Sequence, residues 1–92
     1  METVKTSDLY EASFYLYLNF TLEKIEVIKE NGKLSCVIAF CGEEIKKKQL
    51  EYLNSDVFVN LIDFRKNFNR LKTLVYAEQK KARVAKWPPQ QS

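Results

Sequence analysis

An Asn-Gly pair at positions 31 and 32 constrains the fold of this chain more than any other feature of its sequence. Both residues tolerate the positive φ angles that a type I′ turn requires, so the pair predicts the tip of a β-hairpin. Apolar and polar residues alternate on both sides of it, which predicts strands over residues 22–29 and 34–41. The turn sets the register, in which the facing pairs are Glu30 with Lys33, Val27 with Cys36, Ile25 with Ile38, and Glu23 with Phe40.

One side of this hairpin is apolar and needs a cover. In the predicted register, that side carries Ile25, Val27, Leu34, Cys36, Ile38 and Phe40. A two-stranded ribbon is only marginally stable in water, so helices must pack on its apolar side. The opposite side carries Lys24, Glu26, Ile28, Ser35, Val37 and Ala39, a mixture that we expect to be partly exposed.

A helix is predicted before the hairpin, over residues 9–18, after a lead of residues 1–5 that is either flexible or strand-like. Thr6, Ser7 and Asp8 are N-cap residues, and the helix dipole favours Glu11 in the first turn. Asn19 is suited to a left-handed stop. One helix face carries Leu9, Ala12, Leu16 and Phe20, and an aromatic face beside it carries Tyr10, Phe14 and Tyr17.

Two further helices are predicted after the hairpin. Glu43 and Glu44 favour the start of a short helix, whose inward positions would be Ile45, Gln49, Tyr52 and Leu53. Residues 57–59 are either a brief third strand or an extended lead-in to the last helix. Asn60 and Asp63 resemble a capping arrangement for a long helix that Pro88 and Pro89 end after Trp87. Its apolar seam is Leu61, Phe64, Phe68, Leu71 and Val75.

These elements predict one small α+β domain over residues 1–87, followed by a tail over residues 88–92. The order is helix, β-hairpin, short helix and long C-terminal helix (60–87), with the helices packed on one face of the ribbon. A chain of 92 residues has room for one modest core. No apolar run approaches the roughly 18 residues of a membrane-spanning helix, so no membrane partner is expected.

The rare residue types narrow the chemistry that the chain can perform. The sequence has no histidine, which removes the commonest general base and neutral metal ligand. Cys36 and Cys41 lie in one strand at a spacing that puts them on opposite faces, so we expect buried free thiols in a reducing cytoplasm. No metal, no cofactor and no catalytic activity are expected. An enzyme would need converging carboxylates and lysines, for which the candidates are Asp8, Glu11, Glu43 and Lys72.

The distribution of charge is the strongest functional signal in the sequence. Residues 1–60 hold seven lysines against ten acidic residues, whereas residues 61–92 hold eight basic residues against two acidic ones. This asymmetry predicts a nucleic acid or a nucleoprotein as the partner of the last helix. The predicted binding residues are Arg65, Lys66, Arg70, Lys72, Lys80, Lys81, Arg83, Lys86 and Trp87. The alternatives are a simply solvated helix face and an acidic protein partner.

The aromatic face of the first helix supports a second hypothesis. Tyr10, Phe14 and Tyr17 are either core residues or an exposed patch that binds a protein. In the second case, the chain would be a protein-interaction module. It would act as a phage-type inhibitor or adaptor, or it would form a homodimer.

Several short motifs lie along the chain: Thr6-Ser7-Asp8-Leu9-Tyr10-x-Ala12, the β-hairpin, Tyr52-x-Asn54, and Phe64 followed by Arg70-Leu71-Lys72-x-Leu74. Together they resemble a family of small bacterial and phage domains of unknown function. The chain departs from the pattern at Asn19, where glycine is more usual, and in its basic extension after Tyr76. Because the family has no assigned activity, the resemblance implies the helix–hairpin–helix order and no catalytic residue.

Overall fold

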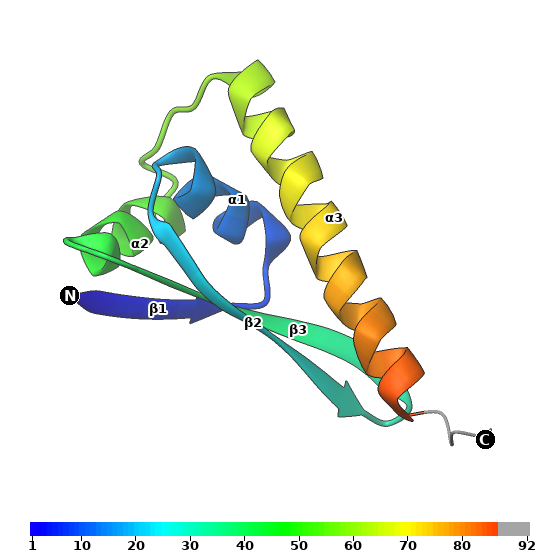
Figure 1. Cartoon of the computed structure of the whole chain (residues 1–92). Helices are drawn as coiled ribbons and strands as arrows, with labels where there is room; N and C mark the ends of the chain where they lie inside the picture. Colours follow the sequence, from blue (N-terminus) through cyan, green and yellow to red (C-terminus); the bar gives the residue numbers. More distant parts are fainter. Residues whose placement is uncertain (87–92) are drawn as a thin grey trace.

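Three antiparallel strands and three helices make up the fold (Figure 1). The computed structural model describes residues 1–86, with side chains through residue 82. The elements are β1 (Glu2–Thr6), α1 (Leu9–Tyr17), β2 (Thr21–Glu30), β3 (Lys33–Gly42), α2 (Ile45–Leu53) and α3 (Leu61–Lys86). The predicted α+β class, the hairpin and the long last helix are therefore confirmed.

The hairpin has the predicted turn and most of the predicted register. Asn31 and Gly32 have φ angles of 51° and 78°, as a type I′ turn requires. The predicted pairs are confirmed from the turn as far as Ile25 with Ile38, and the ladder continues to Lys24 opposite Ala39.

Beyond that point the register shifts at a β-bulge, so the predicted pairing of Glu23 with Phe40 is wrong. Phe40 lies opposite Leu22 instead, because Glu23 is the extra residue of the bulge. Side chains alternate between the two faces of a strand, and an unbroken strand would turn Leu22 toward solvent. The bulge places Leu22 on the apolar face beside Phe40.

The third strand comes from the beginning of the chain. β1 pairs antiparallel with β3, which becomes the central strand of the order β1-β3-β2. Val4 lies opposite Phe40 and Thr6 opposite Ile38, and both β1 side chains are buried. The strand-like alternative for residues 1–5 is confirmed, whereas a third strand at residues 57–59 is wrong, because those residues pair with no strand and lead into α3.

The core lies between the sheet and the helices, with α1 between the sheet and α3 (Figure 1). Asp8 caps α1, since its Oδ1 accepts a hydrogen bond from the Tyr10 amide at 2.8 Å. Every residue from Glu11 to Tyr15 is buried, because the middle of α1 is covered on all sides. The Tyr15 ring lies 5.4 Å from the ring of Phe40 on the central strand. From α3, Leu71 and Val75 complete this core.

Two residues that were predicted to face inward are exposed. Leu53 ends α2 and Leu61 begins α3, so the two residues stand at either end of the connection that joins these helices. Helical spacing places Leu61 in line with Leu71 and Val75, but no other element covers the first turn of α3. The predicted cap of this helix is confirmed, since Asn60 Oδ1 accepts a hydrogen bond from the Asp63 amide at 3.1 Å.

Candidate nucleic-acid interface

The solvent side of α3 is basic along most of the helix. Its cationic side chains in the described part of the chain are all exposed, and they are Arg65, Lys66, Arg70, Lys72, Lys80 and Lys81. From Arg65 to Lys80 they extend over about 22 Å, at 1.5 Å per helical residue. Arg83 and Lys86 belong to α3, but their side chains lie outside the described ones, and Trp87 lies outside the described residues altogether.

Carboxylates of the same fold leave most of this charge unpaired. Lys81 Nζ lies 3.3 Å from the Glu78 carboxylate, one turn earlier on the helix. Among the side chains that the structure describes, none of the other five cations has a carboxylate oxygen within 4.0 Å. The positive potential of the helix is therefore available to an anion from outside.

Contact between α1 and α3 brings two predicted sites together. Tyr10 was predicted for a protein interface, and its ring stacks on the ring of Phe68 with centroids 5.0 Å apart and planes 14° from parallel. Lys72, predicted for nucleic acid, holds its Nζ 5.6 Å from the centroid of the same Phe68 ring. Tyr10 keeps 60% of its surface exposed, so an exposed aromatic ring and a cation both pack against the same Phe68 side chain.

The other two residues of the predicted aromatic face have different positions. Phe14 is only 3% exposed and packs in the core, so it cannot contact a partner. Tyr17 is half-buried, and its hydroxyl accepts a hydrogen bond from the Asn60 amide at 3.0 Å, which ties α1 to the start of α3. Of the three rings, Tyr10 alone is exposed.

Sequence reasoning missed Tyr76 as a candidate binding residue. Its side chain is 60% exposed, and it follows Lys72 and precedes Lys80 by four residues each. Residues four apart are neighbours on a helix surface, so this ring lies between two lysines. This signal was present in the sequence, because Tyr76 lies outside the apolar seam of α3 and at a spacing of four from two surface lysines.

The most extensive buried hydrogen-bond network centres on Glu11, outside this interface. Its carboxylate accepts hydrogen bonds from Thr6 Oγ1 at 3.0 Å, Tyr15 Oη at 2.5 Å and Gln49 Nε2 at 3.3 Å. Burial raises the pKa of Tyr15, and its hydrogen bond to Glu11 raises it further, so the phenol stays a donor. Glu11 thereby joins β1, α1 and α2 as a structural group.

The other residues considered for catalysis lie in different settings. Asp8 caps α1, Glu43 is exposed before α2, and Lys72 lies over Phe68. None of these three is among the residues that contact the Glu11 carboxylate in the described structure.

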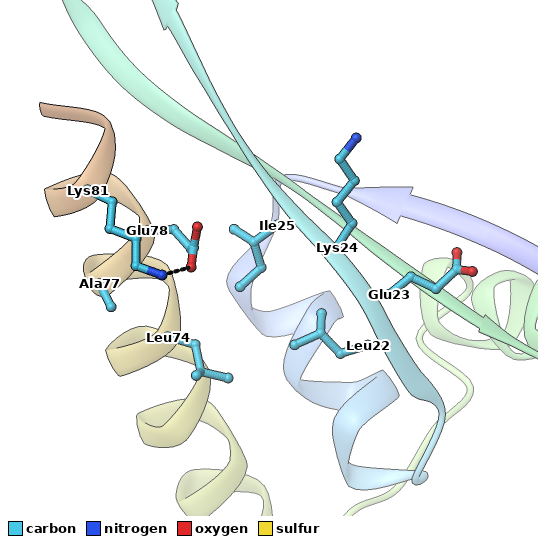
Figure 2. Close-up of a pocket in the computed structure, with 8 residues that line it drawn as sticks. All are labelled: Leu22, Glu23, Lys24, Ile25, Leu74, Ala77, Glu78 and Lys81. Carbon is cyan, nitrogen blue, oxygen red and sulfur yellow. Dashed lines mark hydrogen bonds and ion pairs between the residues drawn. The ribbon is translucent and has the colours of Figure 1, made fainter. Parts of the chain in front are cut away.

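A groove of about 430 Å³ runs between β2 and α3 (Figure 2). Leu22 and Ile25 point toward α3, and Leu74 and Ala77 form the opposite wall. Glu23 and Lys24, at the bulge, point away from α3, while Glu78 and Lys81 are joined by their ion pair. Because residues two apart on a helix point nearly opposite ways, Leu74 in the groove and Tyr76 lie on different sides of α3.

The described part of the chain contains neither a membrane-spanning helix nor a metal-binding group. None of its helices has the length and apolar character needed to cross a bilayer. No three cysteine or acidic side chains of the described residues gather into a group fit for a metal ion, and Cys36 and Cys41 are free thiols. Cys36 is buried as predicted, whereas Cys41 is only partly buried.

Comparisons with family models, curated proteins and solved structures find no match to this chain, so the resemblance to a family of unknown function stays a prediction.

Proposed function

We propose that this protein binds nucleic acid through the solvent side of α3, as a binding protein and not as an enzyme. The observation that carries the proposal is the row of exposed α3 cations that have no carboxylate partner among the described side chains: Arg65, Lys66, Arg70, Lys72 and Lys80. A helix that merely needs a solvated surface gains from mixed charges, which form pairs between neighbouring turns. Five unpaired cations on one helix repel each other, and a polyanion removes that repulsion.

The same cations account for the expected strength of binding. Each phosphate that a lysine or arginine neutralises releases condensed counterions, and this release favours binding at low salt. Contacts with phosphates carry no information about base sequence. We therefore expect sequence-independent binding whose affinity falls steeply as salt is added.

Removal of four α3 cations should reduce both the affinity and its dependence on salt. The variant combines Arg65→Gln, Lys66→Gln, Arg70→Gln and Lys80→Gln, and it spares Lys72 because that side chain packs on Phe68. Because the variant neutralises four fewer phosphates, the slope of log K against log salt should decrease in magnitude by roughly 3. The measurement is fluorescence anisotropy of a labelled oligonucleotide, titrated at several salt concentrations.

A control variant distinguishes binding at α3 from attraction by the net charge of the whole protein. It replaces four exposed lysines elsewhere by glutamine, namely Lys5, Lys33, Lys46 and Lys47. The change in net charge is the same, but the slope should stay close to that of the unchanged protein. An equal loss of affinity and of salt dependence in both variants would contradict the proposal. Absence of binding by the unchanged protein at low salt would contradict it as well.

An exposed apolar stretch favours a second candidate function, self-association. Five large apolar side chains between residues 50 and 62 are more than half exposed, and they are Leu50, Leu53, Phe58, Leu61 and Ile62. Exposed apolar side chains that gather on one surface mark protein–protein contacts. A homodimer through this stretch would replace the aromatic face that was predicted for an interface.

Self-association has a direct test in the mass of the protein in solution. If the stretch is an interface, the chain should be a dimer at about 100 μM, and Phe58→Asp with Leu61→Asp should make it a monomer, because charges are depleted from interface cores. Light scattering coupled to size-exclusion chromatography gives both masses. A monomeric unchanged chain at that concentration would exclude this candidate.

A further inference from the structure

Aromatic and cationic side chains alternate along one ridge of α3. Phe68, Lys72, Tyr76 and Lys80 follow each other at steps of four residues, so each is a surface neighbour of the next. Lys72 Nζ already lies over the Phe68 ring, at 5.6 Å from its centroid. Lys72, Tyr76 and Lys80 are all exposed, and the ridge therefore presents cation, ring and cation to solvent in turn.

Tyr10 adds a second exposed ring at the start of this ridge. It comes from α1 and stacks on Phe68, the same ring that Lys72 Nζ approaches. Because the Tyr10 ring is already ordered by its contact, a ligand that stacks on it loses less side-chain entropy in binding. Phe68, on which Tyr10 stacks, and Tyr76 lie on either side of Lys72 along the helix, eight residues or about 12 Å apart.

From this alternation we infer that the ridge formed by Tyr10, Phe68, Lys72, Tyr76 and Lys80 is a site for single-stranded nucleic acid. The inference rests on the proposed function and names its substrate class. Lys72 and Lys80 neutralise backbone phosphates, while Tyr10 and Tyr76 stack on bases. A length of about 12 Å corresponds to three or four nucleotides of one strand at the B-form spacing of 3.4 Å.

A duplex makes poorer use of the same ridge. In a double helix the faces of the bases are stacked on each other, so exposed tyrosine rings have no base face to contact. Electrostatics alone would favour the duplex, because both strands add their phosphates to its charge density. A preference for the single strand would therefore show that the tyrosine rings contribute to binding, because the lysines alone would favour the duplex.

Two tyrosine variants test the inference against oligo(dT) of about 12 nucleotides and a duplex of equal length. The unchanged protein should bind the single strand at least about fivefold tighter than the duplex at the same salt concentration. Tyr76→Leu keeps an apolar side chain of good helix propensity, and it should weaken single-strand binding by about five- to tenfold, as the loss of one stacked base predicts. Tyr10→Leu should act in the same direction, and neither should change duplex binding more than about twofold.

The matched control is Phe58→Leu, which removes a ring that is 95% exposed but lies outside the ridge. It should leave both affinities unchanged within about twofold. The Tyr76 side chain makes no described aromatic or hydrogen-bonding contact, so Tyr76→Leu should keep the fold even if Tyr10→Leu destabilises α1. Equal binding of the single strand and the duplex, or a silent Tyr76→Leu variant, would overturn the inference and leave the proposed function intact. Absence of binding to either oligonucleotide at low salt would overturn both.

Discussion

Replacement of Phe40 by alanine is expected to lower the free energy of unfolding by about 4 kcal/mol. Phe40 has no exposed surface, and it lies on the central strand between Val4 of β1 and Leu22 of β2. Its ring also packs against Tyr15 of α1, so the cavity would open where the sheet meets the helices. Neighbours on three elements cannot all move into the gap, so the loss should fall well within the range of about 3–5 kcal/mol for such substitutions.

The effect is large compared with the whole stability of a small domain. A chain of this length is stable by about 5–14 kcal/mol, and a loss of 4 kcal/mol should lower the Tm by about 15–30 °C. Phe58→Ala makes the same chemical change at a side chain that is 95% exposed, and it should shift the Tm by only a few degrees. Thermal unfolding followed by circular dichroism measures both, and equal shifts would show that Phe40 is not in the core.

Replacement of Glu11 by alanine is expected to cost about 3 kcal/mol, although the position is polar. The carboxylate accepts hydrogen bonds from Thr6, Tyr15 and Gln49, and the Thr6 and Tyr15 side chains are themselves buried. Without Glu11, two buried hydroxyl groups lose their acceptor, and each buried group without a partner costs about 1–3 kcal/mol. Urea unfolding gives the change in free energy from the shift of the midpoint.

Two controls identify the source of the Glu11 effect. Glu11→Gln keeps one acceptor oxygen and nearly the same shape, and it should destabilise less than the alanine variant does. Glu43→Ala removes an exposed glutamate, and its effect should stay within about 0.5 kcal/mol. A loss of less than 0.5 kcal/mol in Glu11→Ala would mean that water replaces the carboxylate and that the network adds little to stability.

Local signals in the sequence were enough to predict the hairpin, and long-range contacts were not. Asn31 and Gly32 determine the turn by their own conformational preferences, and the register follows from the turn as far as Lys24. The bulge at Glu23 brings Leu22 beside Phe40 in the core. No residue near Glu23 in the sequence predicts this bulge. The pairing of β1 with β3 is likewise a contact between distant segments.

Burial of the middle of α1 on all sides explains why its sequence pattern was interpreted incompletely. Helical periodicity separates a covered face from a solvated one, and it loses that power where the helix is enclosed. Tyr15 is fully buried and central to the core, yet it belonged to neither predicted face of the helix. The exposed cations of α3 were easier to predict, because one side of that helix does face solvent.

The part of the candidate site that depends on spacing along α3 could be predicted from the sequence, whereas the part that depends on packing between helices could not. Helical spacing alone identifies Lys72 and Lys80 as surface residues, and it also puts Tyr76 between them. The stack of Tyr10 on Phe68 depends on how α1 packs against α3, and spacing says nothing about that angle. Leu61 was wrongly predicted to face inward for a related reason. The sequence does not show that the first turn of α3 extends past the elements that cover the rest of the helix.

The central position of β3 has a consequence for the order of events as the chain is synthesised. β1 emerges from the ribosome first, but its partner strand emerges only after α1 and the whole of β2. At the usual rates of translation, this delay lasts seconds. The backbone hydrogen-bonding groups of the opening strand therefore stay without their sheet partner on the nascent polypeptide until the last strand has been made.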